Sequence, residues 1–247
     1  ALAFKFLSNA DLILELGLLK REVFIIIWIL ISLSCLIYLI NSLRFKRSLI
    51  LYLLIAFFSY STINLSLGVK EKSSYKLALL SGLLPPTFYT VYENNNGCPL
   101  GLNCFKDFEK GLLESRYTNK PMLIDFTGWA CANCRRVEEN TWSKNDIYNM
   151  INDEFILISL YVDDRSDLNK DQIVILKDKN GNEKTLKKVG EKWSAFQTIN
   201  FKNNSQPYYV LLSPNLEVLN KPIQYTDTET YQSWLSEGLE NFNKNYK

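Results

Sequence analysis

The sequence predicts a small α/β domain preceded by α-helical transmembrane segments. Three observations lead to this expectation. Residues 1–69 are mostly apolar, whereas residues 70–247 hold nearly all of the Asn, Lys, Asp and Glu. The apolar part contains two uncharged runs that are long enough to cross a bilayer. In the polar part, strand-like apolar runs alternate with helix-forming segments, as they do in α/β folds.

Composition excludes several classes of function. The 247 residues carry a formal net charge of +2 and show no basic stripe interleaved with aromatic residues, so no nucleic-acid partner is expected. The chain has no histidine, which removes imidazole as a general base, the triads that use it, and most catalytic zinc sites. The chain begins at Ala1, inside an apolar segment and without Met, so we expect it to be a piece of a longer polypeptide.

Residues 1–69 are expected to form a transmembrane region. Residues 23–40 are uncharged and rich in Ile and Leu, and residues 49–67 form a second span. Residues 1–19 are interrupted by charged and polar side chains, and we interpret them as the end of an earlier membrane segment. A buried core helix is the alternative for each span. A signal peptide is a further alternative for the first span, although no small-residue cleavage site follows it.

The charge of the loop between the two spans predicts their orientation. Residues 41–48 include Arg44, Lys46 and Arg47 and no acidic residue, which favours a cytoplasmic location by the positive-inside rule. Basic residues on the outer flanks of both spans weaken this asymmetry. With the loop inside, the polar region after residue 70 lies in an oxidising compartment, where disulfide chemistry is expected.

Two cysteines mark the start of the polar domain, which we place at residues 98–247. Residues 70–97 precede it as a linker, because they are rich in turn residues and show no periodicity. Cys98 and Cys104 enclose a short loop. A structural disulfide between them is our main interpretation, and a second redox pair or free thiols are the alternatives.

The elements of the domain can be expected in chain order. Up to residue 162 we expect a helix over 105–116, a strand over 122–126, a helix from 131 past 139, a helix over 144–152 and a strand over 155–162. A hairpin over 171–188, turning at 179–182, and a short helix over 193–196 follow. The domain is expected to end with paired strands over 207–212 and 216–223 and a last helix from 226. Strand, helix and strand over 122–162 indicate a right-handed parallel crossover. Thr226 and Glu229 fit a capping box.

One Cys-x-x-Cys motif carries the chemistry. Cys131 and Cys134 lie where a predicted strand ends and a helix begins. A thiolate at a helix N-terminus faces unpaired N–H groups and the positive end of the helix dipole, which lower its pKa and favour attack on a disulfide. The spacing lets the two sulfurs bond to each other. A purely structural disulfide, or a four-thiolate zinc site together with Cys98 and Cys104, is the alternative.

Further residues around this motif carry a resemblance to a known family. Residues 126–142 read Phe-Thr-Gly-Trp-Ala-Cys-Ala-Asn-Cys-Arg-Arg-Val-Glu-Glu-Asn-Thr-Trp, Asp125 precedes Cys131 by six residues, and Pro207 opens a later apolar strand. With the apolar segments upstream, the chain resembles the thioredoxin fold and, within it, the C-terminal part of the DsbD-type transmembrane thiol:disulfide reductases of cytochrome c biogenesis. The resemblance covers nearly the whole chain and implies an α/β thioredoxin-like domain with a central mixed sheet flanked by helices.

The resemblance assigns roles near the thiols. Cys131, whose sulfur would lie outermost, is the nucleophile, and Cys134 is the resolving thiol. Asp125 would move the proton of Cys134 and have a raised pKa. Glu138 resembles a second acid near the thiols, and we expect the two carboxylates to disfavour the thiolate of Cys131. An ordinary solvated helix position is the alternative for Glu138.

The substrate side of the site is expected at two other places. Pro207 resembles the cis-proline that faces the motif in thioredoxin folds, and the backbone at Gln206 would pair with a substrate strand. A trans proline that starts a strand is the alternative. Trp129 would either cover the sulfurs or join the core. The residues Ala132-Asn133 depart from common thioredoxin usage and leave the reduction potential open.

The resemblance also implies a function and a location. The expected protein is a membrane-anchored protein-disulfide reductase without organic cofactor or metal, in which the Cys131–Cys134 disulfide is the redox group. Its expected partners are a cysteine pair in an upstream membrane domain of the same polypeptide, periplasmic thiol:disulfide proteins, and membrane lipid. Cys35 stands alone in the first span, so no such membrane pair is visible here. The expected location is the bacterial inner membrane, multi-pass, with the domain in the periplasm. A thioredoxin-shaped binding or chaperone module and a tethered disulfide oxidase are the alternatives.

Overall fold

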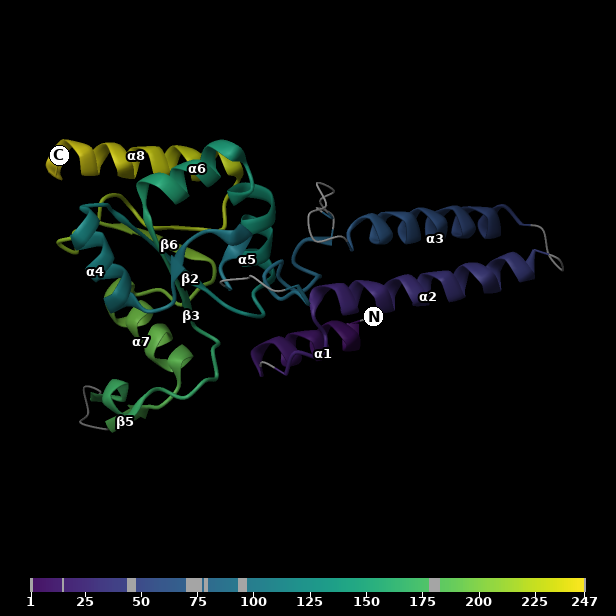
Figure 1. The fold of residues 1–247 in the computed structure, drawn as a ribbon, viewed down its shortest axis with the longest axis horizontal. Helices are drawn as coiled ribbons and strands as arrows, with labels where there is room; N and C mark the ends of the chain where they lie inside the picture. Colours follow the sequence, from purple (N-terminus) through teal and green to yellow (C-terminus); the bar gives the residue numbers. More distant parts are fainter. Residues whose placement is uncertain are drawn as a thin grey trace.

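The computed structural model describes residues 2–14, 16–43, 48–69, 77, 80–92, 97–177 and 183–246. The N-terminal helices extend to one side of an α/β part (Figure 1). Three features expected from the sequence lie partly or wholly outside the described residues: the basic residues of the loop 41–48, much of the linker 70–97, and the hairpin turn at 179–182.

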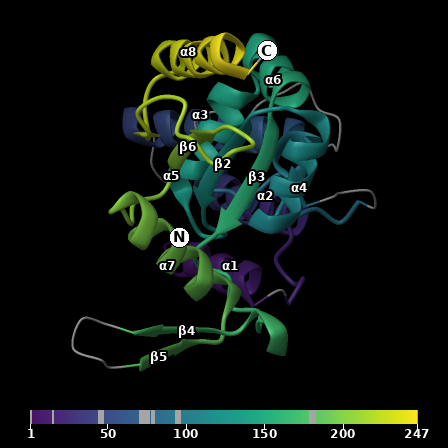
Figure 2. The same cartoon turned by 90° about the vertical axis from the view of Figure 1, so that its left-hand side faces the viewer.

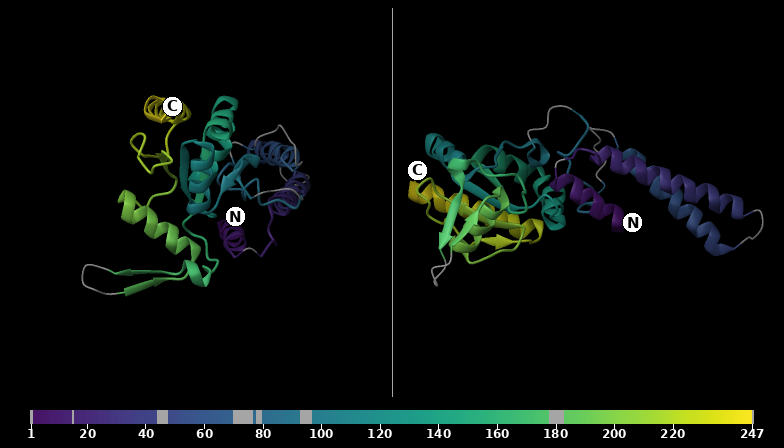
Figure 3. Two further views of the ribbon diagram at one scale, coloured as in Figure 1. Left: turned by 60° about the vertical axis from the view of Figure 1, so that its left-hand side comes forward. Right: turned by 90° about the horizontal axis from the view of Figure 1, so that it is seen from below.

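The apolar part of the chain is helical. It contains α1 (Leu2–Ile13), α2 (Arg21–Ser42) and α3 (Leu49–Leu67), and α2 and α3 lie side by side (Figures 1 and 3). By length and composition alone, both α2 and α3 could cross a membrane. Few of their side chains are buried within the protein. Where the two helices meet, the hydroxyl groups of Ser32 and Thr62 lie 2.8 Å apart and share a hydrogen bond.

A five-stranded mixed sheet forms the centre of the α/β part. Its order is β1 (Cys104–Phe105), β3 (Ile156–Tyr161), β2 (Met122–Thr127), β6 (Tyr208–Leu212) and β7 (Ile223–Gln224). β3 runs parallel to β1 and β2, whereas β6 is antiparallel to β2 and β7. β2 is central and buried along its whole length. The parallel crossover and the mixed sheet expected from the sequence are therefore present.

Helices cover both faces of this sheet (Figure 2). On one face, α4 (Phe108–Thr118) and α7 (Val189–Phe201) pack on alternate residues of β2, namely Met122, Ile124 and Phe126. On the other face lie α5 (Ala132–Val137), the π-helix η3 (Glu138–Trp142), α6 (Asn145–Glu154) and α8 (Thr228–Tyr246). Leu123 of β2 packs into this second layer. Because side chains alternate along a strand, Asp125 faces the same layer as Leu123, which is the layer that carries α5.

A separate hairpin completes the fold. The short 3₁₀ helix η4 (Lys170–Gln172) leads into β4 (Val174–Lys177), which pairs antiparallel with β5 (Glu183–Leu186). Another 3₁₀ helix, η2 (Pro99–Gly101), precedes β1.

Several expected boundaries are corrected by the structure. The predicted helix over 105–116 begins at Phe108, because Phe105 belongs to β1 and the carboxylate of Asp107 caps the helix by accepting a hydrogen bond from the Lys110 amide at 3.1 Å. The short helix predicted at 193–196 extends over all of α7.

The C-terminal elements also differ from expectation. The strand predicted over 216–223 is reduced to β7 and one bridge at Val218. Leu216 adopts a φ of 69°, which interrupts an extended strand. The last helix begins at Thr228 rather than at Thr226. Its first turn is capped by Asp227, whose carboxylate accepts a hydrogen bond from the Thr230 amide at 2.9 Å, so the Thr226 capping box is wrong.

Candidate active site

The two cysteines of the motif form a disulfide at the start of α5. Cys131 is the N-cap residue, and its sulfur accepts a hydrogen bond from the Cys134 amide at 3.1 Å. Cys131 is partly exposed, whereas Cys134 is 0% exposed. The helix therefore leaves one sulfur partly exposed and covers the other, and the roles of nucleophile and resolving thiol stay predictions.

An open hollow lies beside Cys131. Its lining comes from the loop before α5, from the end of β3 and from the loop before β6: Gly128, Ala130, Cys131, Ala132, Asn133, Val162, Asp163 and Gln206. The peptide bond between Gln206 and Pro207 is cis. The side-chain amide of Gln206 donates hydrogen bonds to Gln197 and to the Asn204 carbonyl, which orient it at this rim. The structure therefore brings Gln206 and the first cysteine to one surface.

The loop that enters the motif is held by a carboxylate that lies just beyond the end of β3 and that the sequence analysis missed. Asp163 accepts hydrogen bonds from the amides of Trp129 and Ala130, at 2.7 and 3.0 Å. The Trp129 ring stacks on Tyr161 with ring centres 3.7 Å apart, and its indole N–H donates to Asp164. Trp129 thus braces the wall of the site from the β3 side.

We expect Asp163→Ala to lower the free energy of unfolding by roughly 1–3 kcal/mol, because two amides lose a charged acceptor. The loss should exceed that of Asp171→Ala, a matched change at an exposed position of η4. Urea unfolding of the full chain in detergent micelles measures both. Equal stabilities of the two variants would contradict this role for Asp163.

Two acids are buried beneath the motif. Asp125 is 1% exposed; Ser159 donates to its Oδ2 at 3.3 Å, and its Oδ1 has no hydrogen-bond partner among the described residues. Burial raises the pKa of Asp125 to about 7, although Arg135 and the Ser159 hydrogen bond oppose the rise. Glu138 is 5% exposed, so the alternative of a solvated helix position is wrong. Burial raises the pKa of Glu138 to about 8 against the opposing charge of Arg135.

Comparison with known proteins agrees with this geometry. A family model described as thioredoxin-like matches residues 103–185. The chain carries a thioredoxin-like domain. Within it, the β2–α5–β3 unit carries the Cys-x-x-Cys disulfide at the start of α5. No sequence match is found among curated proteins.

Solved structures with a similar fold are distant in sequence. A DsbH oxidoreductase superposes with a TM-score of 0.42 at 12% identity, over 61% of this chain and 93% of that one. A thioredoxin from Thermus thermophilus gives 0.39 at 12% identity, over 55% and 85%. A thioredoxin-fold protein from Helicobacter pylori gives 0.37 at 18% identity, over 53% and 75%.

The thioredoxin-like domain contains a buried cation that the sequence analysis missed. Arg135, next to Cys134 in α5, is 2% exposed. Its guanidinium lies 2.6 Å from the Glu138 carboxylate and donates to Thr127 at 3.2 Å. The i,i+3 spacing of Arg135 and Glu138 was a usable signal, because such residues share one face of a helix. The sequence did not show that this face points inward.

A segment of the predicted linker also belongs to the site. We call residues 80–92 the strap. Its Phe88 ring lies 5.3 Å from the Arg135 guanidinium and meets Trp129 edge-on at 5.8 Å. Its Gly82 has a φ of 82°, and a side chain there would lie 2.7 Å from the Ala132 carbonyl oxygen. The strap therefore packs directly on the Cys-x-x-Cys helix.

The strap also ties the site to the N-terminal helices. Arg21, the first residue of α2, donates to the Pro85 carbonyl and forms an ion pair with Glu139 at 3.0 Å. Glu22 accepts hydrogen bonds from the Thr90 hydroxyl and the Val91 amide, at 2.6 and 2.9 Å. As a result α5 lies at the side of the domain nearest to α1 and α2 (Figure 1).

The remaining cysteines lie apart from this motif. Cys98 and Cys104 form a second disulfide, with Cys98 buried and Leu102 of the enclosed loop in the core. Cys35 in α2 is a free thiol. Over the described ranges, no three Cys, Asp or Glu side chains gather as metal ligands.

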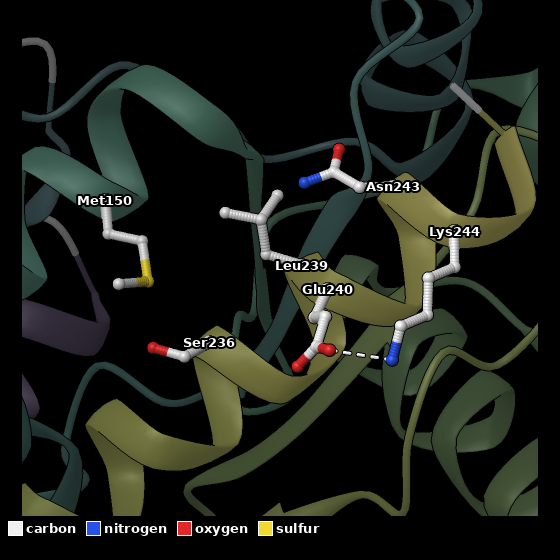
Figure 4. Close-up of a pocket in the computed structure, with 6 residues that line it drawn as sticks. All are labelled: Met150, Ser236, Leu239, Glu240, Asn243 and Lys244. Carbon is white, nitrogen blue, oxygen red and sulfur yellow. Dashed lines mark ion pairs between the residues drawn. The ribbon is translucent and has the colours of Figure 1, made fainter.

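A second surface pocket lies between α6 and α8 and is lined by Met150, Ser236, Leu239, Glu240, Asn243 and Lys244 (Figure 4). Glu240 and Lys244 form an ion pair across one helical turn at 2.7 Å. None of the predicted site residues lines this pocket.

Proposed function

We propose that this chain is a membrane-anchored thiol:disulfide reductase that relays two electrons from membrane-domain cysteines to periplasmic thiol proteins. One observation carries the proposal: a disulfide at the start of α5 presents a partly exposed Cys131 to an open hollow and keeps Cys134 buried. A bond meant only for stability needs no such asymmetry. An exchange reaction needs this asymmetry, because the exposed sulfur must react with a partner first and the covered sulfur attacks only in the second step.

The exchange proceeds in two steps. In the reduced protein, the Cys131 thiolate attacks a partner disulfide, so that one S–S bond forms to Cys131 and the other partner sulfur leaves as a thiolate. Cys134 then loses its proton and attacks Cys131, and the second partner sulfur leaves as a thiolate. The partner gains two electrons, and the Cys131–Cys134 disulfide is formed. An upstream dithiol returns this disulfide to the dithiol state by the same steps in reverse.

The N-terminal helices support anchoring. Large apolar side chains on α2 and α3 face outward, for example Ile37, Tyr38, Leu49 and Ile50, and lipid would cover such a surface. The strap and the Arg21–Glu139 ion pair hold α5 near the first turn of α2. We propose that this position lets a cysteine pair in a neighbouring membrane domain exchange electrons with the redox site. The predicted orientation places the domain in the periplasm.

Trapping tests the exchange. We expect Cys134→Ser in the full chain to accumulate mixed disulfides through Cys131, because the resolving thiol is gone. The matched control, Cys131→Ser, should accumulate none. Non-reducing electrophoresis followed by mass spectrometry of the trapped species reads the result. A binding or chaperone module would give no adducts in either variant.

The equilibrium potential of the motif tests the direction. Redox titration of the full chain against dithiothreitol and glutathione buffers is expected to give a value near that of thioredoxin, about −270 mV. A value near about −120 mV would instead indicate a disulfide oxidase and would contradict the reductase proposal.

A further inference from the structure

Two buried carboxyl groups and one buried guanidinium lie on β2 and on the helical segment that carries Cys134: Asp125 on β2, Arg135 directly after Cys134, and Glu138 about one helical turn after it. Arg135 lies 2.6 Å from Glu138, and its charge also acts on Asp125. All three side chains are at most 5% exposed. Such a group of charges is stable in a dry interior only when its net charge is close to zero. With one cation and two acids, the cluster is neutral when it holds a single proton.

The strap covers the guanidinium of this cluster. Phe88 lies over the guanidinium at 5.3 Å, and the strap is fixed by Gly82 against Ala132 and by the hydrogen bond from Asn140 to Ser81. The charged and titratable groups that interact with the cluster come from several elements: Lys5 of α1, Tyr161 of β3, Glu139 of η3, Tyr209 of β6 and Tyr231 of α8. Of these, Glu139 is neutralised by its ion pair with Arg21 of α2.

We propose that Arg135 is a positioning residue for proton transfer: its buried charge keeps one of the two buried carboxyls ionised, and this carboxylate accepts the proton of Cys134 during resolution. The inference rests on the proposed exchange reaction. Without Arg135, the neutral state of the cluster would require both acids to be protonated, and no base would remain beneath Cys134. The raised pKa values, about 7 for Asp125 and about 8 for Glu138, agree with a cluster that holds one proton between these values.

The proton and electrons balance in this step. The Cys134 S–H bond breaks, and its proton moves to the carboxylate of the cluster. The Cys134 thiolate forms the bond to Cys131, the bond between Cys131 and the partner breaks, and the partner sulfur leaves with the electron pair. The oxidant is the partner disulfide.

The net charge of the cluster predicts that two variants shift the pH at which its acids ionise in opposite directions. Arg135→Met removes the cation, so the remaining acids should hold their protons to higher pH. Glu138→Gln leaves one cation and one acid, which are neutral together without any proton, so Asp125 should ionise at lower pH. Arg135→Lys retains the charge and should restore most of the wild-type behaviour.

The test uses the full chain with Cys35→Ser, in detergent micelles, reduced by one equivalent of dithiothreitol. An excess of 5,5′-dithiobis(2-nitrobenzoate) releases one thionitrobenzoate when Cys131 attacks and a second when Cys134 resolves the mixed disulfide. The rate of the second release rises with pH as the base ionises, and the midpoint of this rise gives the pH at which the base is half ionised. We expect Arg135→Met to shift the midpoint upward by at least about one pH unit, which makes resolution about tenfold slower at pH 7, and Glu138→Gln to shift it downward.

Each outcome decides between the proposals. A missing first release in the wild type would overturn the exchange reaction and this inference together. A normal first release would overturn the inference alone in two cases. In the first, the pH profiles of the second release coincide in the wild type and both variants. In the second, Arg135→Met and Glu138→Gln shift the midpoint of this profile in the same direction. If Arg135→Met fails to fold, Glu138→Gln still decides, because an unchanged or raised midpoint contradicts the charge count.

Discussion

In the reduced full chain, iodoacetamide is expected to alkylate Cys131 at least about a thousandfold faster than Cys134. Cys131 is the N-cap of α5, so its thiolate faces the free N–H groups of the first turn and is partly exposed. Cys134 is 0% exposed, and burial in the protein interior disfavours a charged thiolate. Alkylation of such a thiol requires local opening of the domain, and this opening limits its rate.

Mass spectrometry of peptides after timed alkylation measures the two rates in one sample. Cys35, a free thiol in α2, serves as an internal reference for a cysteine outside the motif. In a urea-unfolded sample the difference between Cys131 and Cys134 should disappear, because it arises from the fold. Comparable rates for the two thiols in the folded chain would mean that the helix does not separate a nucleophile from a resolving thiol.

The elements around the motif could be predicted because local signals and tertiary packing agree there. The strand before Cys131 is an apolar run that becomes β2, and the helix after it starts at Ala132, one residue after the expected start. Asp125 could be placed as a buried acid, since the strand around it is apolar on both faces. Signals of this kind depend on neighbours in the sequence, and they are strong where a segment is buried throughout.

Contacts between distant segments account for what was missed. Gly82 and Phe88 lie in a stretch without periodicity, and only their packing on Ala132 and Arg135 gives them a role. Arg135 and Arg136 are the same residue type at adjacent positions, yet Arg135 is buried and Arg136 is exposed. Arg135 contacts Thr127 of β2 and Phe88 of the strap, and no local sequence pattern records such contacts between distant segments.

The second large effect concerns stability. We expect Asp125→Asn to raise the free energy of unfolding at pH 8 by about 2–4 kcal/mol. Asp125 carries a buried carboxyl whose Oδ1 has no hydrogen-bond partner among the described residues, and burial raises its pKa from 3.8 to about 7. Each pKa unit corresponds to about 1.4 kcal/mol, which gives about 4 kcal/mol as an upper bound. An amide of the same shape avoids the ionisation.

The pH dependence identifies the cause. Between about pH 4 and pH 7 the folded chain binds more protons at this site than the unfolded chain, so the stability that Asp125 contributes at low pH is lost as the pH rises through about 7. Asp125→Asn should therefore gain little at pH 4 and most at pH 8. Urea unfolding at both pH values measures the gain, with the exposed Asp171→Asn as control. An equal gain at both pH values would assign the effect to packing and not to the proton.

The same variant should resolve mixed disulfides more slowly, because it removes an acid of the cluster beneath Cys134. In Asp125→Asn, Arg135 and Glu138 remain as a neutral ion pair, so the cluster becomes more stable. The Glu138 carboxylate in this pair then accepts a proton less readily. The wild-type chain thus retains a destabilising buried acid at the position where the reaction needs a base. Stability at pH 8 and the rate of the second thionitrobenzoate release should change in opposite directions when Asp125 is replaced. Parallel changes would show that Asp125 acts on the fold alone.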